Sequence, residues 1–236
     1  FVFSNSEELS KDMMALSALS RHASIFRAHS CSFVKNVNVC TRQLPVRHFW
    51  AWLNSVFNQV DPDRIKQCGP DRACAEWLLR CGASVKWKDK DFWEKDYNLL
   101  PGSNYERYKI EGIDATSSAI MAVGFPHLRG LKHVRSIILH DCRYLYDDAI
   151  GYLSLVKDTL EFLQLSNCGD ITDAGLVPLT ELTNLKKLIL FSLPEVSDPQ
   201  KAEAMLKSAL PKCDVQFTES RPVEEGEKME SKDSKR

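Results

Sequence analysis

The stretch LEFLQLSNCGDITDAGLVPL, residues 160–179, decides the fold of this chain. Leu160, Leu163 and Leu165 are spaced as L-x-x-L-x-L, and Cys168 follows shortly after. In a short strand this spacing places Leu163 and Leu165 on one face. A small buried residue such as Cys168 fits where the chain turns out of the strand. The stretch therefore predicts one strand followed by a turn and a capped helical segment.

The same pattern recurs on both sides of this stretch. The neighbouring copies read VRSIILHDCRYLYDDAIGYL, residues 134–153, and LKKLILFSLPEVSDPQKAEAML, residues 185–206. The anchors Ile137, Leu163 and Leu188 recur at a nearly constant interval, and a degenerate first copy places Ile113 one such interval before Ile137. A period of roughly 20–29 residues with this pattern is typical of leucine-rich repeats. We predict an α/β fold, a short leucine-rich-repeat solenoid of about four repeats with parallel strands plus helices.

The segment that precedes the repeats predicts a helical cap. Apolar residues from Phe49 to Val60 follow helical spacing, and Gly69-Pro70 starts a second helix that ends at Gly82. Val85–Trp87 is long enough for a brief strand. We divide the chain into a leader and transit peptide (1–48), an N-terminal helical cap domain (49–108), leucine-rich repeats (109–217) and a disordered tail (218–236).

The first part of the chain predicts mitochondrial import. Residues 13–48 contain five Arg or Lys, five Ser and no Asp or Glu, which is the composition of a transit peptide. The sequence opens on Phe1, and we expect Met13 or Met14 to be the first translated residue. The segment 218–236 holds six acids and five bases with almost nothing apolar, so we expect a solvated tail.

Several function classes are disfavoured by composition. The net charge of −1 argues against a nucleic-acid binder. The eight cysteines never form C-x-x-C, so zinc ribbons and dithiol redox motifs find no support, and we expect most of them to be free thiols. Phosphate-binding loops and hydrolase motifs are missing from the sequence. We therefore predict neither an enzyme nor a small-molecule substrate.

Repeat proteins bind partners through the exposed face of their strands. In the repeat register, four apolar residues stand where solvent is expected: Ile138, Phe162, Ile189 and Phe191. An exposed apolar patch suggests a partner-binding surface. The alternative is that neighbouring loops cover these side chains.

Four segments carry a resemblance to a known family. They are FWAWLNSVFN at 49–58, GPDRACAEWLLRCGA at 69–83, KDYNLLP at 95–101 and YKIEGIDAT at 108–116. These segments, together with the repeats up to about residue 217, resemble the mitochondrial ATP synthase subunit s family. It is also called coupling factor B or distal membrane-arm assembly component 2-like. The resemblance implies a coupling factor on the matrix side of the inner membrane, peripherally bound to the membrane sector of ATP synthase. Such a factor supports proton conduction without leak.

The same resemblance implies two chemical features. The family's magnesium site matches Gly82, in RCGA, and Thr116, in IDAT, so Mg²⁺ is the implied cofactor. The family's thiol chemistry involves a Cys-x-Cys pair in a repeat. Here His140 stands at the first position, which leaves Cys142 as the candidate redox thiol.

Two other functions fit the sequence. One is an assembly factor for a respiratory-chain membrane complex. The other is an F-box-like leucine-rich-repeat adaptor, because Leu44-Pro45 precedes an aromatic-rich helix and Cys-containing repeats. The acid-free stretch 13–48 favours a mitochondrial role. Because the predicted folded part is mildly acidic, we expect protein contact to hold it at the membrane more than lipid charge does.

Overall fold

The computed structural model describes residues 46–218, with side chains from residue 52 onward. The predicted transit peptide and the predicted tail therefore lie outside the described residues, apart from residues 46–48 and 218. The described residues belong to one compact unit. None of their helices has the length and apolar character needed to cross a membrane.

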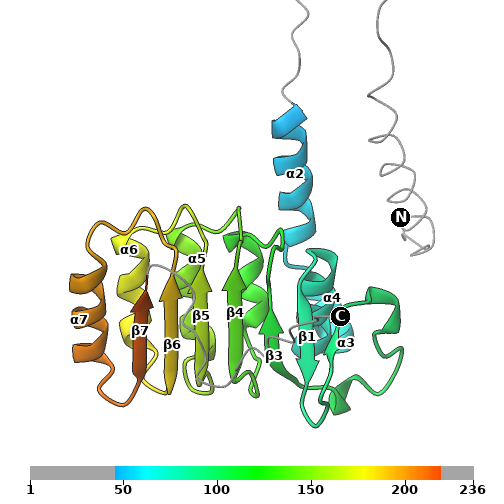
Figure 1. Cartoon of the computed structure of the whole chain (residues 1–236). Coiled ribbons are helices and arrows are strands. Elements are labelled where there is room, and N and C mark those ends of the chain that lie inside the picture. The colour runs from blue at the N-terminus through cyan, green and yellow to red at the C-terminus, as the bar shows by residue number, and fades with distance from the viewer. Residues whose placement is uncertain (1–45, 219–236) are drawn as a thin grey trace, which may run out of the picture. The chain divides into compact units, whose positions relative to one another are not determined.

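A seven-stranded sheet in the order β2-β1-β3-β4-β5-β6-β7 runs through this unit (Figure 1). The strands are β1 (Ser84–Trp87), β2 (Trp93–Glu94), β3 (Ile110–Asp114), β4 (Ser136–His140), β5 (Phe162–Ser166), β6 (Lys187–Phe191) and β7 (Asp214–Thr218). Strands β3 to β7 are parallel, whereas β1 is antiparallel to both of its neighbours. The predicted α/β class with parallel strands is confirmed.

The strand register follows the spacing of the sequence anchors. Ile113 pairs with Ile137, Ile137 with Leu163, Leu163 with Leu188, and Leu188 with Val215. All five side chains are buried and belong to one hydrophobic core. The next inward position repeats the arrangement with Leu139, Leu165 and Leu190, which are at most 1% exposed. Like residues therefore stack on like residues from strand to strand.

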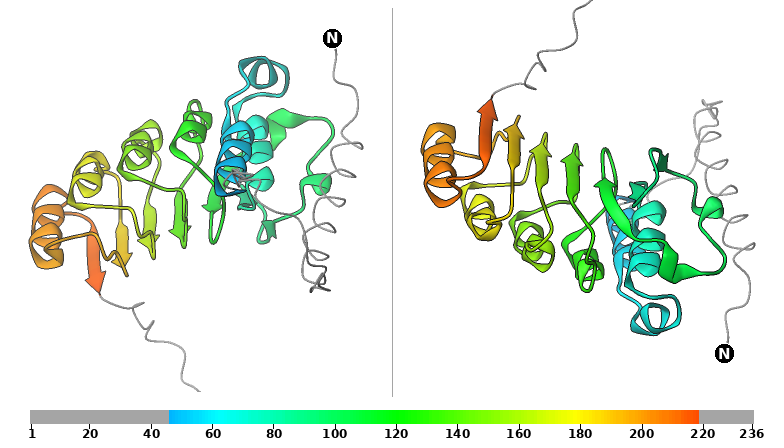
Figure 2. Two further views of the ribbon diagram at one scale, coloured as in Figure 1. Left: turned by 90° about the horizontal axis from the view of Figure 1, so that it is seen from above. Right: turned by 90° about the horizontal axis from the view of Figure 1, so that it is seen from below.

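Helical segments follow the parallel strands and lie together on one face of the sheet (Figure 2). They are η3 (Ala122–Leu128), α5 (Asp147–Gly151) with η4 (Tyr152–Val156), α6 (Asp173–Leu176) with η5 (Val177–Glu181), and α7 (Pro199–Ala209). The helical segment after β5 is capped by Thr172, whose side chain accepts a hydrogen bond from the Ala174 amide. The α-helix ends at Leu176. Pro178 has no amide hydrogen to continue it, and the chain goes on as a 3₁₀ turn.

The chain leaves successive strands through the same turn. Ser117, Asp141, Asn167 and Ser192 have φ of 54°, 53°, 51° and 52°, a left-handed conformation that short polar side chains tolerate better than most. The Asp141 carboxylate accepts hydrogen bonds from Ser117 Oγ at 3.0 Å and from Asn167 Nδ2 at 3.2 Å. These bonds join three consecutive turns side by side. They hold the ends of the strands in register.

The N-terminal segment contributes three helices, α2 (Val46–Asn58), α3 (Pro62–Cys68) and α4 (Pro70–Arg80). The Asp61 carboxylate caps α3, and Pro residues occupy the first turns of α3 and α4. The start of α4 at Gly69-Pro70 agrees with the prediction. The chain leaves α4 through Gly82, whose φ of +85° few other residues adopt readily. The segment is not only helical, because β1 and β2 extend the sheet beyond β3.

One buried amide joins the N-terminal helices to the repeats. Asn58 Nδ2 donates to the carbonyl oxygens of Asn54, at 2.8 Å, and Ala119, at 3.0 Å. Its Oδ1 accepts from Trp77 Nε1 at 2.9 Å and from the Met121 amide at 2.8 Å. With all four bonds made, the amide carries no unpaired polar atom into the core. It fixes α2 and α4 against the loop that follows β3.

A buried carboxylate organises the outer side of α4. Glu76 is 3% exposed and accepts hydrogen bonds from Arg64 Nη2 at 2.6 Å and Arg72 Nε at 2.7 Å. Burial works to raise the pKa of Glu76, but the hydrogen bonds from the two guanidinium groups outweigh it, and the pKa lies below its ordinary value. Arg72 also donates to the Pro101 carbonyl and lies over the Tyr105 ring, 5.5 Å from its centre. The cluster ties α3 and the loop before β3 to α4.

Candidate functional site

The face of the sheet opposite the helical segments is the first candidate site, and we call it the open face. Its residues alternate with the core residues along β3 to β7. They are Gly112, Asp114, Ser136, Ile138, His140, Phe162, Gln164, Ser166, Lys187, Ile189, Phe191, Asp214, Gln216 and Thr218. Polar and apolar side chains are mixed on it, as on a surface that binds a partner.

Two of the four residues predicted to be exposed on the open face are buried. Ile138 and Phe162 are half-buried, but Ile189 is 7% exposed and Phe191 is 5% exposed. Both buried residues lie on β6, where the Phe191 ring lies 5.9 Å from the His140 ring. Ile189 is aligned between Gln164 and Gln216. The prediction of exposure was therefore wrong for Ile189 and Phe191, because side chains on adjacent strands shield a side chain between them.

A polar cluster lies in the middle of the open face. His140 Nδ1 is 2.9 Å from Ser166 Oγ, and Gln164 Nε2 donates to the same oxygen at 3.0 Å. The ring of Phe191 lies 5.9 Å from the His140 ring. The Ser166 oxygen accepts from Gln164, and the direction of its bond with His140 depends on the tautomer of the imidazole. Ser166 is fully buried, so this pair serves packing and does not present a nucleophile to a substrate.

Close packing covers the first parallel strand on the open face. A Cβ added to Gly112 would lie 2.8 Å from Trp93 Cη2 and 2.9 Å from Ser136 Oγ. Only glycine leaves room there for the indole of β2. The open surface therefore starts at β4, the strand that carries the half-buried Ile138, and the half-buried Phe162 lies at the start of the next strand.

The structure brings the two residues of the implied magnesium site into neighbouring loops. Pairing of β1 with β3 aligns Ser84 with Asp114. Gly82 stands just before Ser84, and Thr116 just after Asp114. Both Gly82 and Thr116 are exposed. A contact between these loops was not deducible from spacing, because β1 runs antiparallel to the repeats.

The donors in these loops are oxygens. Thr116 Oγ1 and the Thr116 amide both bond to Asp114 Oδ1, at 2.6 and 3.0 Å. The Gly82 carbonyl and the Asp114 carboxylate add further oxygen atoms, which are the ligands Mg²⁺ prefers. Within residues 46–218 no group of three or more His, Cys, Asp or Glu could hold a metal ion. A cation here would keep several water ligands. Asp114 lies beside Thr116, and the repeat pattern presents it as an ordinary strand position.

The candidate redox thiol has the surroundings of a core residue. Cys142 is 1% exposed, and its Sγ donates to the Ala115 carbonyl at 3.0 Å. Hydrogen bonding with Cys168 and burial raise the pKa of the Cys142 thiol well above its ordinary value. The thiol therefore stays protonated at neutral pH, and the thiol is the unreactive form.

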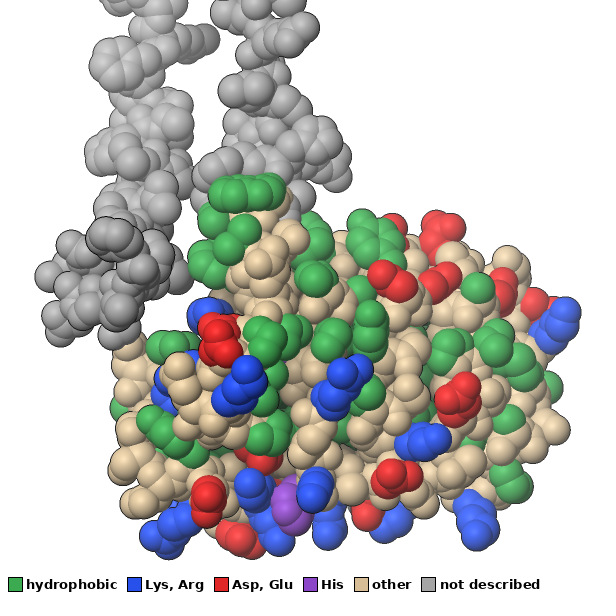
Figure 3. All heavy atoms as spheres, turned by 180° about the vertical axis from the view of Figure 1, so that it is seen from behind, with side chains coloured by type: hydrophobic (Ala, Val, Ile, Leu, Met, Phe, Trp, Pro, Cys, Tyr) green, Lys and Arg blue, Asp and Glu red, His purple; other side chains and the backbone are tan. Residues whose placement is uncertain are grey.

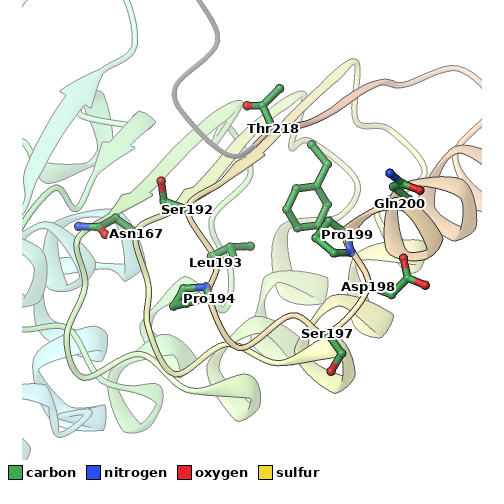
Figure 4. Close-up of a pocket in the computed structure, with 10 residues that line it drawn as sticks. Asn167, Ser192, Leu193, Pro194, Ser197, Asp198, Pro199, Gln200 and Thr218 are labelled. Atoms are coloured by element: carbon green, nitrogen blue, oxygen red, sulfur yellow. The ribbon is translucent and has the colours of Figure 1, made fainter.

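A cavity of about 750 Å³ opens beside the last two strands (Figure 4). Leu193, Pro194, Pro199 and Phe217 form its apolar lining, and Asp198, the residue that caps α7, lies at its rim. The cavity was not predicted, because its walls come from β7, the turn after β6 and the start of α7. These segments are separated in the sequence and meet only at the end of the stack.

Comparison with known proteins shows extended similarity. The human protein named "ATP synthase subunit s, mitochondrial" is 47% identical over 174 residues, which cover 72% of this chain and 87% of the relative. The bovine protein of the same name is 46% identical over 175 residues, with the same coverage. The Drosophila melanogaster protein named "Distal membrane arm assembly component 2" is 30% identical over 158 residues, covering 65% of this chain and 55% of that protein. No family model matches the chain.

Proposed function

Because the chain belongs to the family of mitochondrial ATP synthase subunit s, we propose that it is a non-enzymatic accessory factor of the mitochondrial ATP synthase. The observation that carries this proposal is the 47% identity over 174 residues, since it covers 87% of the human relative. The relatives are named as mitochondrial proteins. The acid-free composition of residues 13–48 supports the same location for this chain.

The proposal also specifies where and how the protein binds the synthase. The protein binds the membrane sector of the synthase from the matrix side, peripherally, and supports proton conduction without leak. The open face supplies the surface for that contact, with Ile138 and Phe162 as its partly accessible apolar residues. What supports this choice is that both side chains remain partly accessible on a sheet face free of described helices. Aromatic residues in such positions are frequent hot spots of protein interfaces.

We also propose that the stacked units are leucine-rich repeats that form a short solenoid. The support is the regular spacing of the anchors together with the alignment of Ile113, Ile137, Leu163 and Leu188 across parallel strands. In this description residues 49–108 are a cap that covers the first repeat. Such a cap shields the apolar end of a stack, which no neighbouring repeat would otherwise cover.

The binding surface can be tested with one substitution. Phe162→Ser removes the half-buried aromatic ring, and we expect cosedimentation with stripped inner-membrane particles to weaken by about 30-fold, the equivalent of about 2 kcal/mol. Val177→Ser is the matched control. Val177 is 52% exposed on the helical side of the sheet. Its replacement by Ser therefore reduces the exposed apolar area without altering the open face.

Circular dichroism of both variants checks that the fold is kept. A folded Phe162→Ser protein that binds as well as wild type would rule out the open face as the contact. Loss of binding in both variants would show that the effect of Phe162→Ser is not specific to the open face.

We further propose a weak Mg²⁺ site at Gly82, Thr116 and Asp114, where the cation orders the loop after α4 against the loop after β3. Thr116→Val removes one oxygen and keeps the size of the side chain. We expect calorimetric titration with Mg²⁺ to show affinity reduced at least about tenfold, the scale found even for residues that only support a ligand. Thr183→Val, at another exposed position, is the control. Equal affinity in wild type and Thr116→Val would place any bound Mg²⁺ elsewhere.

A second candidate function is assembly of a respiratory-chain membrane complex. The observation that favours it is the 30% identity to the Drosophila protein named for distal membrane arm assembly. Native gels of mitochondria that lack the protein separate the two roles. A coupling role leaves all complexes assembled and lowers ATP synthesis, whereas an assembly role leaves a partly built membrane complex.

A further inference from the structure

Charge is segregated between the two sides of the parallel sheet at which its strands begin and end, and we call these sides edges. We define the strand-start edge as residues 129–136, 157–162, 183–187 and 211–214, which lead into β4 to β7. It holds seven Lys or Arg and three Asp or Glu. The strand-end edge comprises residues 141–148, 167–173 and 192–198, which follow β4 to β6, and it holds seven Asp or Glu and one Arg. Figure 3 shows mostly Lys and Arg along the lower edge and a group of Asp and Glu at the upper one.

The acidic edge has structural reasons for its charge. Asp147 accepts hydrogen bonds from the Thr172 amide at 2.8 Å and from Thr172 Oγ1 at 2.6 Å, which join adjacent repeats. Asp173 accepts from the Ser197 amide at 3.1 Å in the same way. Asp198 caps α7. Carboxylates are therefore required at this edge to satisfy backbone groups at the helix starts.

Few contacts within the protein explain the positive charge of the strand-start edge. Lys186 pairs with Glu161 at 2.8 Å, and Arg135 approaches Glu111 at 3.8 Å. The remaining cations of this edge make no ion pair with any described residue: Arg129, Lys132, Lys157, Lys187 and Lys212. Only Lys187 among these five is half-buried, and the rest are exposed. The positive charge of this edge is therefore directed at the surroundings.

The geometry of this edge suits a planar anionic surface. Its cations come from consecutive segments that are stacked about 5 Å apart, the spacing of neighbouring strands. Between them lies a shallow recess of about 300 Å³, lined by Lys132, His133, Arg135 and Lys186 and by the carboxylates of Asp158 and Glu161. Flexible lysines in a row can reach several phosphate groups of one surface at the same time.

We infer that the strand-start edge rests on the anionic phospholipids of the membrane. This inference depends on the proposed peripheral association and adds how the protein is oriented: β4 to β7 start at the bilayer, and the acidic edge faces away from it. The charge of the whole chain, −1, conceals this arrangement. Attraction between such a surface and clustered Lys or Arg acts over about a Debye length. The charge of the edge that faces the membrane therefore matters more than the net charge of the chain.

An acidic protein partner fits this edge less well. Protein interfaces are depleted in Lys and usually contain aromatic or other apolar anchors. None of the large apolar side chains exposed within residues 52–218 belongs to the strand-start edge. Leu131, Val134, Leu160 and Leu185 of this edge are buried in the core, and its Phe162 is half-buried and belongs to the open face. An edge that presents exposed cations, with no exposed large apolar side chain among them, matches lipid headgroups instead.

The test compares two charge reversals of equal size. The strand-start variant carries Lys132→Glu and Lys157→Glu. The strand-end variant carries Arg143→Glu, within the strand-end edge, and Lys201→Glu, in the first turn of α7 that follows it. All four positions are exposed. Both variants of the full chain keep the segment 1–48 unchanged and have the same net charge. Their partition is measured on phosphatidylcholine vesicles that contain phosphatidylglycerol. We expect the strand-start variant to bind at least about tenfold more weakly than the strand-end variant, with the difference fading at high salt.

Equal partition of the two variants on these vesicles would overturn the inference. Cosedimentation with stripped inner-membrane particles then separates the remaining possibilities. If the strand-start variant loses binding only to those particles, the edge contacts an acidic protein and the lipid inference fails. If wild type does not bind the particles at all, the proposed association with the membrane complex fails, whatever the vesicle result.

Discussion

Replacing Glu76 with alanine is expected to lower the free energy of unfolding by about 3–5 kcal/mol, the range for breaking a buried ion pair. Glu76 neutralises Arg72, which is 9% exposed, and also pairs with Arg64. Without the carboxylate, the Arg72 guanidinium stays in a low-dielectric setting with only the Pro101 carbonyl to satisfy it. Urea denaturation followed by circular dichroism measures the loss.

Two comparisons make this result specific. Glu106→Ala removes an exposed carboxylate and should change stability by less than about 0.5 kcal/mol. The pKa of Glu76 is below its ordinary 4.5, so its pairing stabilises the fold above that pH and is lost as pH falls through the lowered value. The difference between wild type and Glu76→Ala should therefore narrow in acid. A difference that is already small at neutral pH would show that α4 is not held by this carboxylate.

The second large effect is expected from Leu163→Ala, which should lower the free energy of unfolding by about 2–5 kcal/mol. Leu163 is completely buried between Ile137 and Leu188 on the neighbouring strands. Truncation leaves a cavity that the stacked repeats on both sides can close only in part. The same denaturation experiment measures the change.

Val177→Ala is the control within the same repeat, because Val177 is 52% exposed. We expect it to cost less than about 0.5 kcal/mol. Equal, small losses in the two variants would mean that the strand register does not bury Leu163 as described.

The two effects test different halves of the molecule. Leu163 lies in the stack of repeats, where each unit contributes one strand to a shared core. Glu76 lies among the N-terminal helices, whose β1 and β2 continue the same sheet beyond β3. If residues 49–108 stabilise the repeats as a cap, both substitutions lower the stability of one cooperative unit. The two losses should then be visible at every spectroscopic probe.

The candidate sites divide into parts that sequence could supply and parts that it could not. The repeat register identified the residues of the open face, because alternation along a strand is a local property. Their accessibility is not local. Ile189 and Phe191 were predicted to be exposed and are buried, since the neighbouring strands decide what shields them. Gly82 and Thr116 came from family resemblance, and only the antiparallel pairing of β1 with β3 places their loops together.

The sequence by itself determined the repeated unit, its period and the inward positions. A spacing of L-x-x-L-x-L that recurs at a regular interval buries its leucines by stacking parallel strands. The pattern therefore predicts most of the fold. The tertiary structure alone decided where the charges gather and which apolar residues are shielded. It also decided how the buried amide of Asn58 binds the N-terminal helices to the repeats. The physical reason is that these features depend on distances between segments that lie far apart along the chain. Hydrophobic periodicity carries no information about such distances.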